Sequence, residues 1–331
     1  MTGVFSGPVF ETRSLTATPI RDLGLTIADT QLEPIVVHFL AEIDGAGLSR
    51  IRPRIYLSTE WGVPADTIAL GIPFYLASPE LTDLHRAKGG LVEGTDAEDI
   101  LRYLRHELGH VISHSYKLGE DAEWVRMFGS TAQPYRDHYR AVPFHPNFVS
   151  HLPGWYAQKH PDEDFAETFA VWMAGSGWAE EYGGRPALAK LQYVDRLMLR
   201  LRMEDPLVTD DELDEDVSDI ADTFEELYDF GEDDDRGMPV GLDGALRSIG
   251  RSAGGDFPLA ALIARITPSL QSSVYRWTGQ FPWNTLSLLR HLERRSTALG
   301  LSVDRAREAD AIVALTALVS SLAMNQVMSR R

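Results

Sequence analysis

Three residues at metal-binding spacing, His106, Glu107 and His110, stand in the segment RYLRHELGHVISHSY. Histidines four positions apart on a helix project from one face, so both imidazoles can bind a single ion. Glu107 is rotated by about 100° from His106 on such a helix, which places its carboxylate beside a metal-bound water rather than on the metal. This HExxH arrangement is typical of metal-assisted hydrolysis, in which the glutamate is the general base.

A second acidic cluster, DEDFAE at residues 162–167, follows the HExxH segment by about fifty residues. A catalytic zinc takes three protein ligands and keeps its fourth position open, so a third donor is needed. We predict Glu163 as this ligand, and Glu167, four residues later on the same helical face, can accept the free ring N–H of a ligating histidine. Alternatively, the acidic side chains simply favour the N-terminal end of a helix and face water. Three histidines compete as third ligand: His145, His151 and His160.

The segments HELGH and HLPGWYAQKHPDEDFAETFAVW resemble the bacterial putative zinc-binding metallopeptidases and, more distantly, the gluzincins, which include the catalytic domain of lethal-factor-type toxins. The resemblance covers Thr95 to Trp172, within a region from about Asp29 to Met203. It implies a zinc site in which Glu163 is the third ligand and Glu167 contacts a ligating residue rather than the metal.

The same resemblance implies a role for Tyr156. Lethal-factor-type proteases place a tyrosine seven residues before the ligating glutamate, where it helps to stabilise the oxyanion, and Tyr156 is the matching residue. The thermolysin branch uses a downstream histidine instead, but only His291 lies beyond Glu167, so His151 is the reserve candidate. The alternative for Tyr156 is ordinary packing beside Trp155.

Two helices must position these residues. Thr95 and Glu98 have the spacing of a capping box at the start of the first helix. An apolar stripe at helical spacing follows, made of Ile100, Leu101, Leu104, Leu108, Val111 and Ile112. Pro161 stands near the start of the second helix, which is a favoured place for proline. Its apolar side chains available for packing are Phe165, Phe169, Ala170 and Trp172.

Two apolar runs upstream, Arg54–Thr59 and Thr67–Leu76, indicate strands separated by a turn. Pro73 favours an edge position in the second strand, because proline removes a donor from the ladder. An edge strand beside a metal site can pair with an extended peptide. By resemblance to zincins this strand borders the substrate cleft, and an ordinary edge strand beneath a loop is the alternative.

The upstream segment from Leu32 to Leu40 follows helical spacing, with Asp29 or Thr30 as its cap. The element order is then a helix, a small sheet, the HExxH helix, a long loop and the glutamate helix. That order predicts an α+β fold of the zincin type rather than alternating β-α-β units.

The charge of the chain is uneven. The 331 residues carry a formal net charge of −18, and Glu204 to Asp235 hold seventeen acidic residues with no lysine or arginine, so the remainder carries about −1. Apolar residues interleave with the acids in DELDEDVSDIADTFEELYDF, which predicts an amphipathic helix rather than a structureless polyelectrolyte. This segment could be an ordinary solvated face, or it could recruit a basic protein partner.

Four parts of the chain are expected from these patterns. They are an N-terminal extension over residues 1–28, a zincin-like metallopeptidase domain over 29–203, a partly helical acidic segment over 204–236 and a helical region over 237–331. The last part contains two long helical patterns, Asn284–Ala298 and Arg305–Met328. It could pack with the catalytic part as one domain and serve as a lid, a partner-binding module or a scaffold.

Several classes of protein are disfavoured. The absence of cysteine excludes a thiol nucleophile, cysteine-ligated metal and disulfides within the chain. The N-terminus lacks a basic segment followed by an apolar core, so we expect no secretory signal and cytoplasmic residence. The acidic balance argues against nucleic-acid binding. The apolar run Ala311–Met324 has only fourteen residues, which indicates a buried helix rather than a membrane span.

Together these patterns predict a zinc-dependent peptidase, expected to be an endopeptidase of the gluzincin type that acts on a peptide or protein substrate. Zinc would be bound by His106, His110 and Glu163, with Glu107 as general base and Tyr156 as oxyanion donor. One alternative is a protein-binding module with a structural or vestigial metal site. A latent peptidase held inactive by its own C-terminal half is another.

Overall fold

The computed structural model describes residues 12–135, 139–228, 241–252 and 254–329. Helices make up most of the described chain, and the strands form two small sheets of two strands each. This composition is compatible with the α+β class expected from the sequence. The zincin-type arrangement itself stays a prediction.

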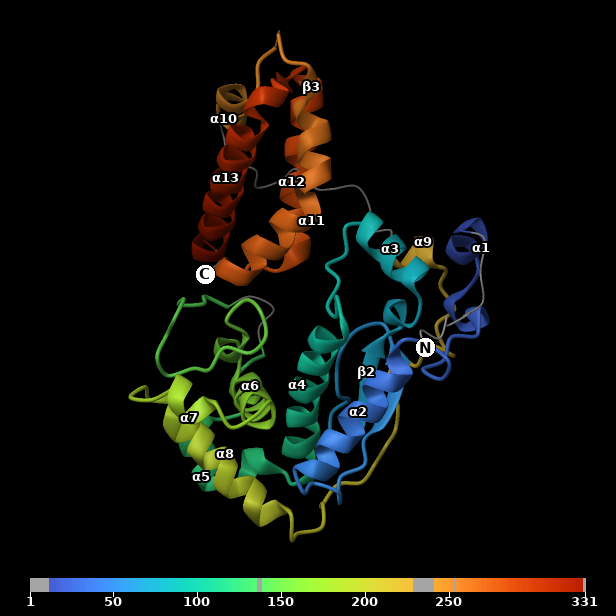
Figure 1. The fold of residues 1–331 in the computed structure, drawn as a ribbon, viewed down its shortest axis with the longest axis vertical. Coiled ribbons are helices and arrows are strands. Elements are labelled where there is room, and N and C mark those ends of the chain that lie inside the picture. The colour runs from blue at the N-terminus through green and yellow to red at the C-terminus, as the bar shows by residue number, and fades with distance from the viewer. Residues whose placement is uncertain (1–11, 136–138, 229–240, 253, 330–331) are drawn as a thin grey trace. The chain divides into compact units, whose positions relative to one another are not determined.

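The chain divides into two compact units (Figure 1). The first is made of three segments: Met1–His85, Val92–Asp137 and Phe144–Asp229. The second consists of Arg86–Leu91, His138–Pro143 and Phe230–Arg331.

The first unit carries most of the elements, in an order that begins with helices, passes through one sheet and continues with helices. In chain order they are α1 (Thr12–Ala17), η1 (Ile20–Leu23), α2 (Leu32–Gly45), β1 (Arg54–Ser58), β2 (Ala69–Pro73), η2 (Phe74–Ala77), α3 (Pro79–Ala87), α4 (Ala97–Ser115), η3 (Leu118–Glu120), α5 (Ala122–Phe128), η4 (Tyr156–Gln158), α6 (Pro161–Met173), α7 (Trp178–Glu181), α8 (Ala187–Leu201) and α9 (Phe224–Leu227). The second unit contains α10 (Leu242–Ile249), β3 (Phe257–Pro258), α11 (Leu259–Thr278), α12 (Pro282–Ala298), β4 (Ser302–Val303), η5 (Arg305–Arg307) and α13 (Glu308–Ser329).

Strands β1 and β2 form a parallel pair whose last partners are Ser58 and Pro73. β2 is shorter than the predicted strand because Pro73 has no amide for the ladder, and the chain turns into η2 directly after it. All five β2 residues are buried, and the Gly71 amide donates to the Gly62 carbonyl at 2.8 Å. That amide is therefore not available to an extended substrate, so the expected peptide pairing along β2 finds no support at this position.

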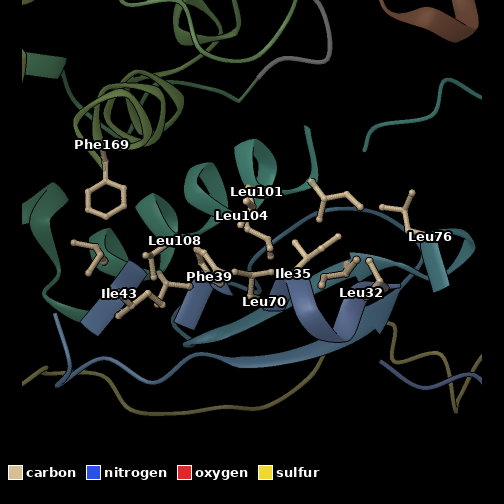
Figure 2. Packing of buried hydrophobic residues seen from close by; sticks show 14 of the residues in the cluster. Leu32, Ile35, Phe39, Ile43, Leu70, Leu76, Leu101, Leu104, Leu108 and Phe169 are labelled. Carbon is tan, nitrogen blue, oxygen red and sulfur yellow. The ribbon is translucent and has the colours of Figure 1, made fainter. Parts of the chain in front are cut away.

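The core of the first unit lies between α2, the β1–β2 sheet and α4 (Figure 2). Helix α2 begins at Leu32 with Gln31 as its N-cap rather than the predicted Asp29 or Thr30, although the Thr30 hydroxyl accepts a hydrogen bond from the Leu32 amide at 3.2 Å. Phe39 on α2 and Leu104 and Leu108 on α4 are completely buried in this layer. Burial of each such side chain stabilises the fold by about 1.5–3 kcal/mol. The apolar stripe of α4 thus anchors the helix that carries the HExxH residues.

The start of α4 differs by one residue from the predicted capping box at Thr95 and Glu98. Asp96 is the N-cap, and its side chain accepts the Asp99 amide at 2.9 Å. The Asp99 carboxylate in turn accepts the Thr95 amide at 3.0 Å. The Asp96 side chain therefore caps the helix, while Asp99 bonds to the amide before the N-cap residue rather than to the N-cap amide, so the predicted reciprocal capping box does not form at Thr95 and Glu98.

Helices α4 and α6 pack directly on each other at Gly109, which lies within the HELGH segment. A methyl group added at Gly109 would lie 2.7 Å from the Cα of Ala166 on α6. Real side chains do not approach a backbone so closely, so the two helices can cross at this distance only with glycine here. The crossing places one helical turn of α6 beside the histidines of α4.

The acidic segment departs from the prediction. An amphipathic helix was expected through Leu213 and Tyr228, but within the described chain only α9 is helical in this region, and the residues before it are irregular. Its backbone is bonded along the first unit at several places. The Leu207 and Val208 amides donate to the Ser115 carbonyl, and the Val217 amide donates to the Leu57 carbonyl. The carbonyls of Asp210, Ile220 and Asp222 accept the amides of Ile68, Arg21 and Ile20. Most of its acidic side chains are exposed, whereas Val217 and Phe224 are buried. These two apolar side chains are therefore buried in the core as separate contacts and do not form a single helical stripe.

The second unit has its own apolar core, formed mainly by α11, α12 and α13. Helix α13 contributes a buried side chain on every fourth residue from Ala311 to Ala323. By length and composition alone, the stretch Arg305–Asn325 would suffice to cross a membrane, a test that core helices of soluble proteins also pass. The absence of membrane contact expected from the sequence stays a prediction.

Candidate metal centre

The crossing of α4 and α6 brings three nitrogen and oxygen donors together. The Nε2 atom of His106 lies 3.2 Å from Nε2 of His110, and Oε2 of Glu163 lies 3.1 Å and 3.3 Å from these two nitrogens. His106 and Glu163 are almost completely buried, and His110 is partly accessible. The three atoms thus form a nearly equilateral triangle at the helix crossing.

The triangle has the size that a zinc ion requires. Zinc is bound by imidazole nitrogen and carboxylate oxygen at about 2.0–2.1 Å in a tetrahedron, whose edges are then about 3.3–3.4 Å long. The observed separations of 3.1–3.3 Å match such an edge closely. His106, His110 and Glu163 form a group that could hold a metal ion. The chemistry of the group also suits zinc, because imidazole nitrogen and carboxylate oxygen are both donor types that bind this ion.

Glu167 lies on the far side of His106 and is completely buried. Its Oε1 atom accepts the Nδ1–H of His106 at 3.0 Å. The backbone amides of His151 and Leu152 also donate to this carboxylate, at 3.0–3.1 Å. A carboxylate fixed in this way sets the ring orientation of the histidine and turns Nε2 toward the triangle. The structure thus places Glu167 in contact with the His106 ring, and its role as a support of a metal ligand stays a prediction.

The neighbouring imidazoles and carboxylates of this cluster shift the pKa values of one another. Burial works against a charge on His106, but hydrogen bonds to Glu163 and Glu167 raise the pKa of His106 to about 10. Burial would likewise raise the pKa of Glu163, but the adjacent His106 and His110 hold it well below its usual range. Glu163 is thus an ionised carboxylate, which is the form that binds a cation.

Glu107 follows His106 on α4 and is buried, with 6% of its surface exposed. Burial raises the pKa of this carboxyl. Positive charge on His106 and His110 opposes the rise, whereas the negative charges of Glu163 and Glu60 add to it. In the part of the chain that the structure describes, no residue makes a hydrogen bond to the Glu107 carboxylate. Its oxygens are therefore free to accept a proton from a small molecule at the site, such as water.

Tyr156 begins the 3-10 turn η4, and its ring centroid lies 5.6 Å from that of His106. Its hydroxyl accepts a hydrogen bond from Nζ of Lys159 at 3.1 Å. A second tyrosine lies closer to the ligand set, because the Tyr135 hydroxyl donates directly to Oε1 of Glu163. The structure thus places Tyr156 beside the site but brings Tyr135 into contact with it.

Sequence reasoning missed both Tyr135 and Lys159. Tyr135 stands in the segment GSTAQPYRDHY, which has neither helical nor strand spacing to any site residue. Lys159 offered a weak signal, because it lies in the same turn as Tyr156 and three residues after it. No local sequence pattern links either position to Glu163, because their contacts depend on how the loop folds against α6.

The competing histidines have other partners. His160 caps α6, accepting the Asp162 amide through Nδ1 at 3.3 Å. His151 donates its Nε2–H to the Arg102 carbonyl at 2.9 Å, and burial lowers its pKa to about 4, so it is neutral. His145 accepts a nearby backbone amide through Nδ1. These contacts favour Glu163 over the three histidines as the third metal ligand. In addition, the Nε2–H of His151 already donates to a backbone carbonyl.

Comparison with known proteins supports a metal site at this place. Residues 82–181 match the model of a family described as a putative zinc-binding metallo-peptidase. The matched stretch contains α4, α6 and the loop between them, and hence all residues of the triangle. The match confirms the resemblance drawn from the HELGH and DEDFAE segments. No curated protein and no solved structure matches the chain.

Proposed function

We propose that this protein is a zinc-dependent peptidase that hydrolyses peptide bonds. The observation that carries the proposal is the triangle of His106, His110 and Glu163 with the buried Glu107 on the same helix as both histidines. The matched family is described as zinc-binding and as a metallo-peptidase, which supports the same conclusion.

In this proposal each residue has one task. His106, His110 and Glu163 would hold a zinc ion, which when bound would supply the Lewis acidity that polarises a peptide carbonyl and lowers the pKa of a nearby water. Glu107 accepts a proton from the attacking water while the new C–O bond forms, and it later gives that proton to the leaving amine as the C–N bond breaks. The products are a carboxylate and an amine. Glu167 holds the His106 ring in place throughout.

Tyr156 is the proposed oxyanion donor. A hydroxyl beside the site can donate to the negative oxygen that develops on the carbonyl carbon, which is the kind of contact that contributes most to such reactions. Its hydrogen bond to Lys159 supports this role, because a cation on the phenol oxygen makes the O–H a stronger donor.

A catalytic site is favoured over a structural one by the number of ligands. Structural zinc sites are closed by four protein ligands, whereas catalytic sites have three and leave one position open. Within the described residues the candidate group has three members. The protein-binding alternative, which uses a closed or vestigial site, therefore has less support than hydrolysis.

The finer assignments are also part of the proposal. We infer a gluzincin-type, zincin-like domain, endopeptidase action on a peptide or protein substrate, and cytoplasmic residence. Exposed acidic side chains along residues 204–228 would suit a basic protein partner. No role for nucleic acid or membrane is proposed.

Substitution of Glu107 by glutamine tests the proposal. Glu107→Gln keeps the size of the side chain but cannot accept the proton, so it should bind zinc as the wild type does and lose nearly all hydrolysis, by at least about 10²-fold. Digestion of a peptide library with and without chelator measures the activity, and metal analysis measures zinc content. Glu98→Gln, on the exposed side of the same helix, is the matched control and should remain active. Undiminished turnover by Glu107→Gln would refute the assignment.

A further inference from the structure

The two carboxylate oxygens of Glu163 have different surroundings. Oε2 faces the imidazoles of His106 and His110 at 3.1 Å and 3.3 Å. Oε1 accepts the hydroxyl proton of Tyr135. One oxygen is therefore turned toward the cation position, and the other is already bonded to a residue from a different segment of the chain.

Tyr135 is kept as a donor by its environment. An ionised carboxylate can only accept a hydrogen bond, so the phenol O–H is the donor in its contact with Oε1 of Glu163. Although 53% of the residue is exposed, its hydroxyl end is directed into the site. The O–H is therefore the donor and the carboxylate the acceptor in this contact.

Lys159 holds Tyr135 from the other side. Its Nζ atom donates to the Tyr135 hydroxyl at 2.8 Å and lies 4.2 Å from the centroid of the ring. The same Nζ atom reaches the Tyr156 hydroxyl at 3.1 Å and lies 4.9 Å from that ring centroid. The Lys159 ammonium thus links Tyr135, which bonds to the proposed ligand Glu163, to Tyr156, the proposed oxyanion donor.

The loop that carries Tyr135 is tied to the start of α6. The ring of Tyr135 packs on His160 with a centroid distance of 5.2 Å. The Nε2–H of His160 donates to the Gln133 carbonyl at 3.0 Å, two residues before Tyr135. Because His160 is the N-cap of the helix that bears Glu163, the tyrosine and the carboxylate are positioned by the same residue.

We propose that Tyr135 is a positioning residue that makes Glu163 bind the cation through Oε2 alone, and that Lys159 holds Tyr135 in place. A carboxylate can bind a metal through one oxygen or both, and binding through both would use the corner that substrate or water requires. The Tyr135 O–H prevents this by occupying Oε1. This inference rests on the proposed function, because it assigns a purpose to the open corner of a catalytic site.

The test measures metal binding rather than turnover. Full-length wild-type protein and Tyr135→Phe are titrated with Zn²⁺ against a chromophoric chelator, and with Co²⁺ by visible absorption. Loss of a hydrogen bond to a metal ligand typically lowers affinity by about 10–100-fold, and we expect that loss for Tyr135→Phe. We also expect weaker cobalt absorption, because a second bound oxygen raises the coordination number and makes the site less tetrahedral.

Tyr116→Phe is the matched control. The Tyr116 hydroxyl donates to the carbonyls of Leu201 and Glu204, so its removal deletes a buried hydrogen bond without touching the triangle. Wild-type zinc affinity and cobalt absorption are expected for this control. Lys159→Met, which removes the ammonium and keeps the stem, should shift both readouts in the direction of Tyr135→Phe.

The outcomes separate the two proposals. If the wild type binds no zinc, the proposed function and the inference fail together. If the wild type binds zinc and Tyr135→Phe matches it in affinity and cobalt spectrum, the inference is overturned while the proposed function stands. If only Lys159→Met behaves like the wild type, Lys159 does not hold Tyr135 in place. Circular dichroism of each variant confirms that the measured change concerns a folded protein.

Discussion

At the scale of single residues, the three glutamates of the candidate site owe their different roles to their hydrogen-bond partners. Glu167 accepts one imidazole N–H and two backbone amides, which fixes it as a support. Glu163 faces two imidazoles with one oxygen and a phenol with the other. Glu107 has none of these partners among the described residues, and this leaves its oxygens available for proton transfer. The roles proposed for these three identical side chains thus differ because their surroundings differ.

A fourth carboxyl near the site, Glu93, gives a pH prediction. Burial, with added repulsion from Glu60 and Glu107, raises the pKa of Glu93 from 4.5 to about 7. The folded protein therefore binds this proton more tightly than the unfolded chain does. The contribution of Glu93 to the free energy of unfolding falls as the pH rises from 4.5 to 7, and the cost of burying its charge is complete above pH 7.

Glu93→Gln should remove this cost, because glutamine resembles the protonated carboxyl. The variant should be more stable than the wild type in urea unfolding at pH 8, and the difference should vanish near pH 4.5. Glu98→Gln, at an exposed carboxylate paired with Arg105, is the control for the removal of a surface charge. A Glu93→Gln variant less stable than wild type at pH 8 would contradict the prediction.

At the scale of elements, the site depends on how closely α4 and α6 cross. Sequence periodicity predicts both helices and puts His106 and His110 on one face, and the structure confirms that both helices exist. The separation of the helices is decided at Gly109, where an added methyl group would meet Ala166. A shift of either helix by a few tenths of an ångström would change the two edges of the triangle that join Glu163 to His106 and His110.

Gly109→Ala is therefore expected to be destabilising, although alanine is the better helix former. Overpacking of a tight contact costs about 1–3 kcal/mol, and zinc affinity should fall because Glu163 is pushed away from the histidines. The control is Gly45→Ala at the end of α2, where an added methyl group meets no atom within 4 Å. Guanidinium unfolding and zinc titration of both variants check this. Equal stability and equal zinc affinity of the two would show that the crossing tolerates a side chain.

At the scale of the whole molecule, the chain has separate apolar cores. One surrounds α2, the β1–β2 sheet and α4, and another joins α10 to α13. All residues of the candidate metal centre belong to the first unit. The acidic segment up to residue 228 also lies in that unit, where its backbone is bonded to the Ile68 amide and the Leu57 carbonyl.

Separate cores predict two thermal transitions, of which zinc should move only one. A ligand that binds only the folded form stabilises the unit that binds it, by about 2.7 kcal/mol when the ligand is at 100 times its dissociation constant. Calorimetry of the full-length protein with zinc and with chelator measures this. Glu163→Ala, which removes one ligand, should abolish the zinc-dependent shift. A single transition that moves as a whole would show that the two units unfold together.

The sequence by itself determined the two helices of the candidate site and the residues that these helices bring to it. The spacing of His106, Glu107 and His110 depends only on helix periodicity, which is local, and the Glu163–Glu167 spacing is equally local. Those patterns were sufficient to predict the two helices and the family resemblance, which the family match confirms. They were also sufficient for the parallel strands to be located within a few residues.

Only the tertiary structure decided how separate segments meet. It showed which oxygen of Glu163 faces the imidazoles, it brought Tyr135 and Lys159 to the site, and it committed the Nε2–H of His151 to the Arg102 carbonyl. It also replaced the expected acidic helix with an irregular segment that is bonded along the first unit. These contacts join residues that are far apart in the chain or lie in loops without a period. Local propensity carries no information about such partners, because their energies arise only once the chain has folded.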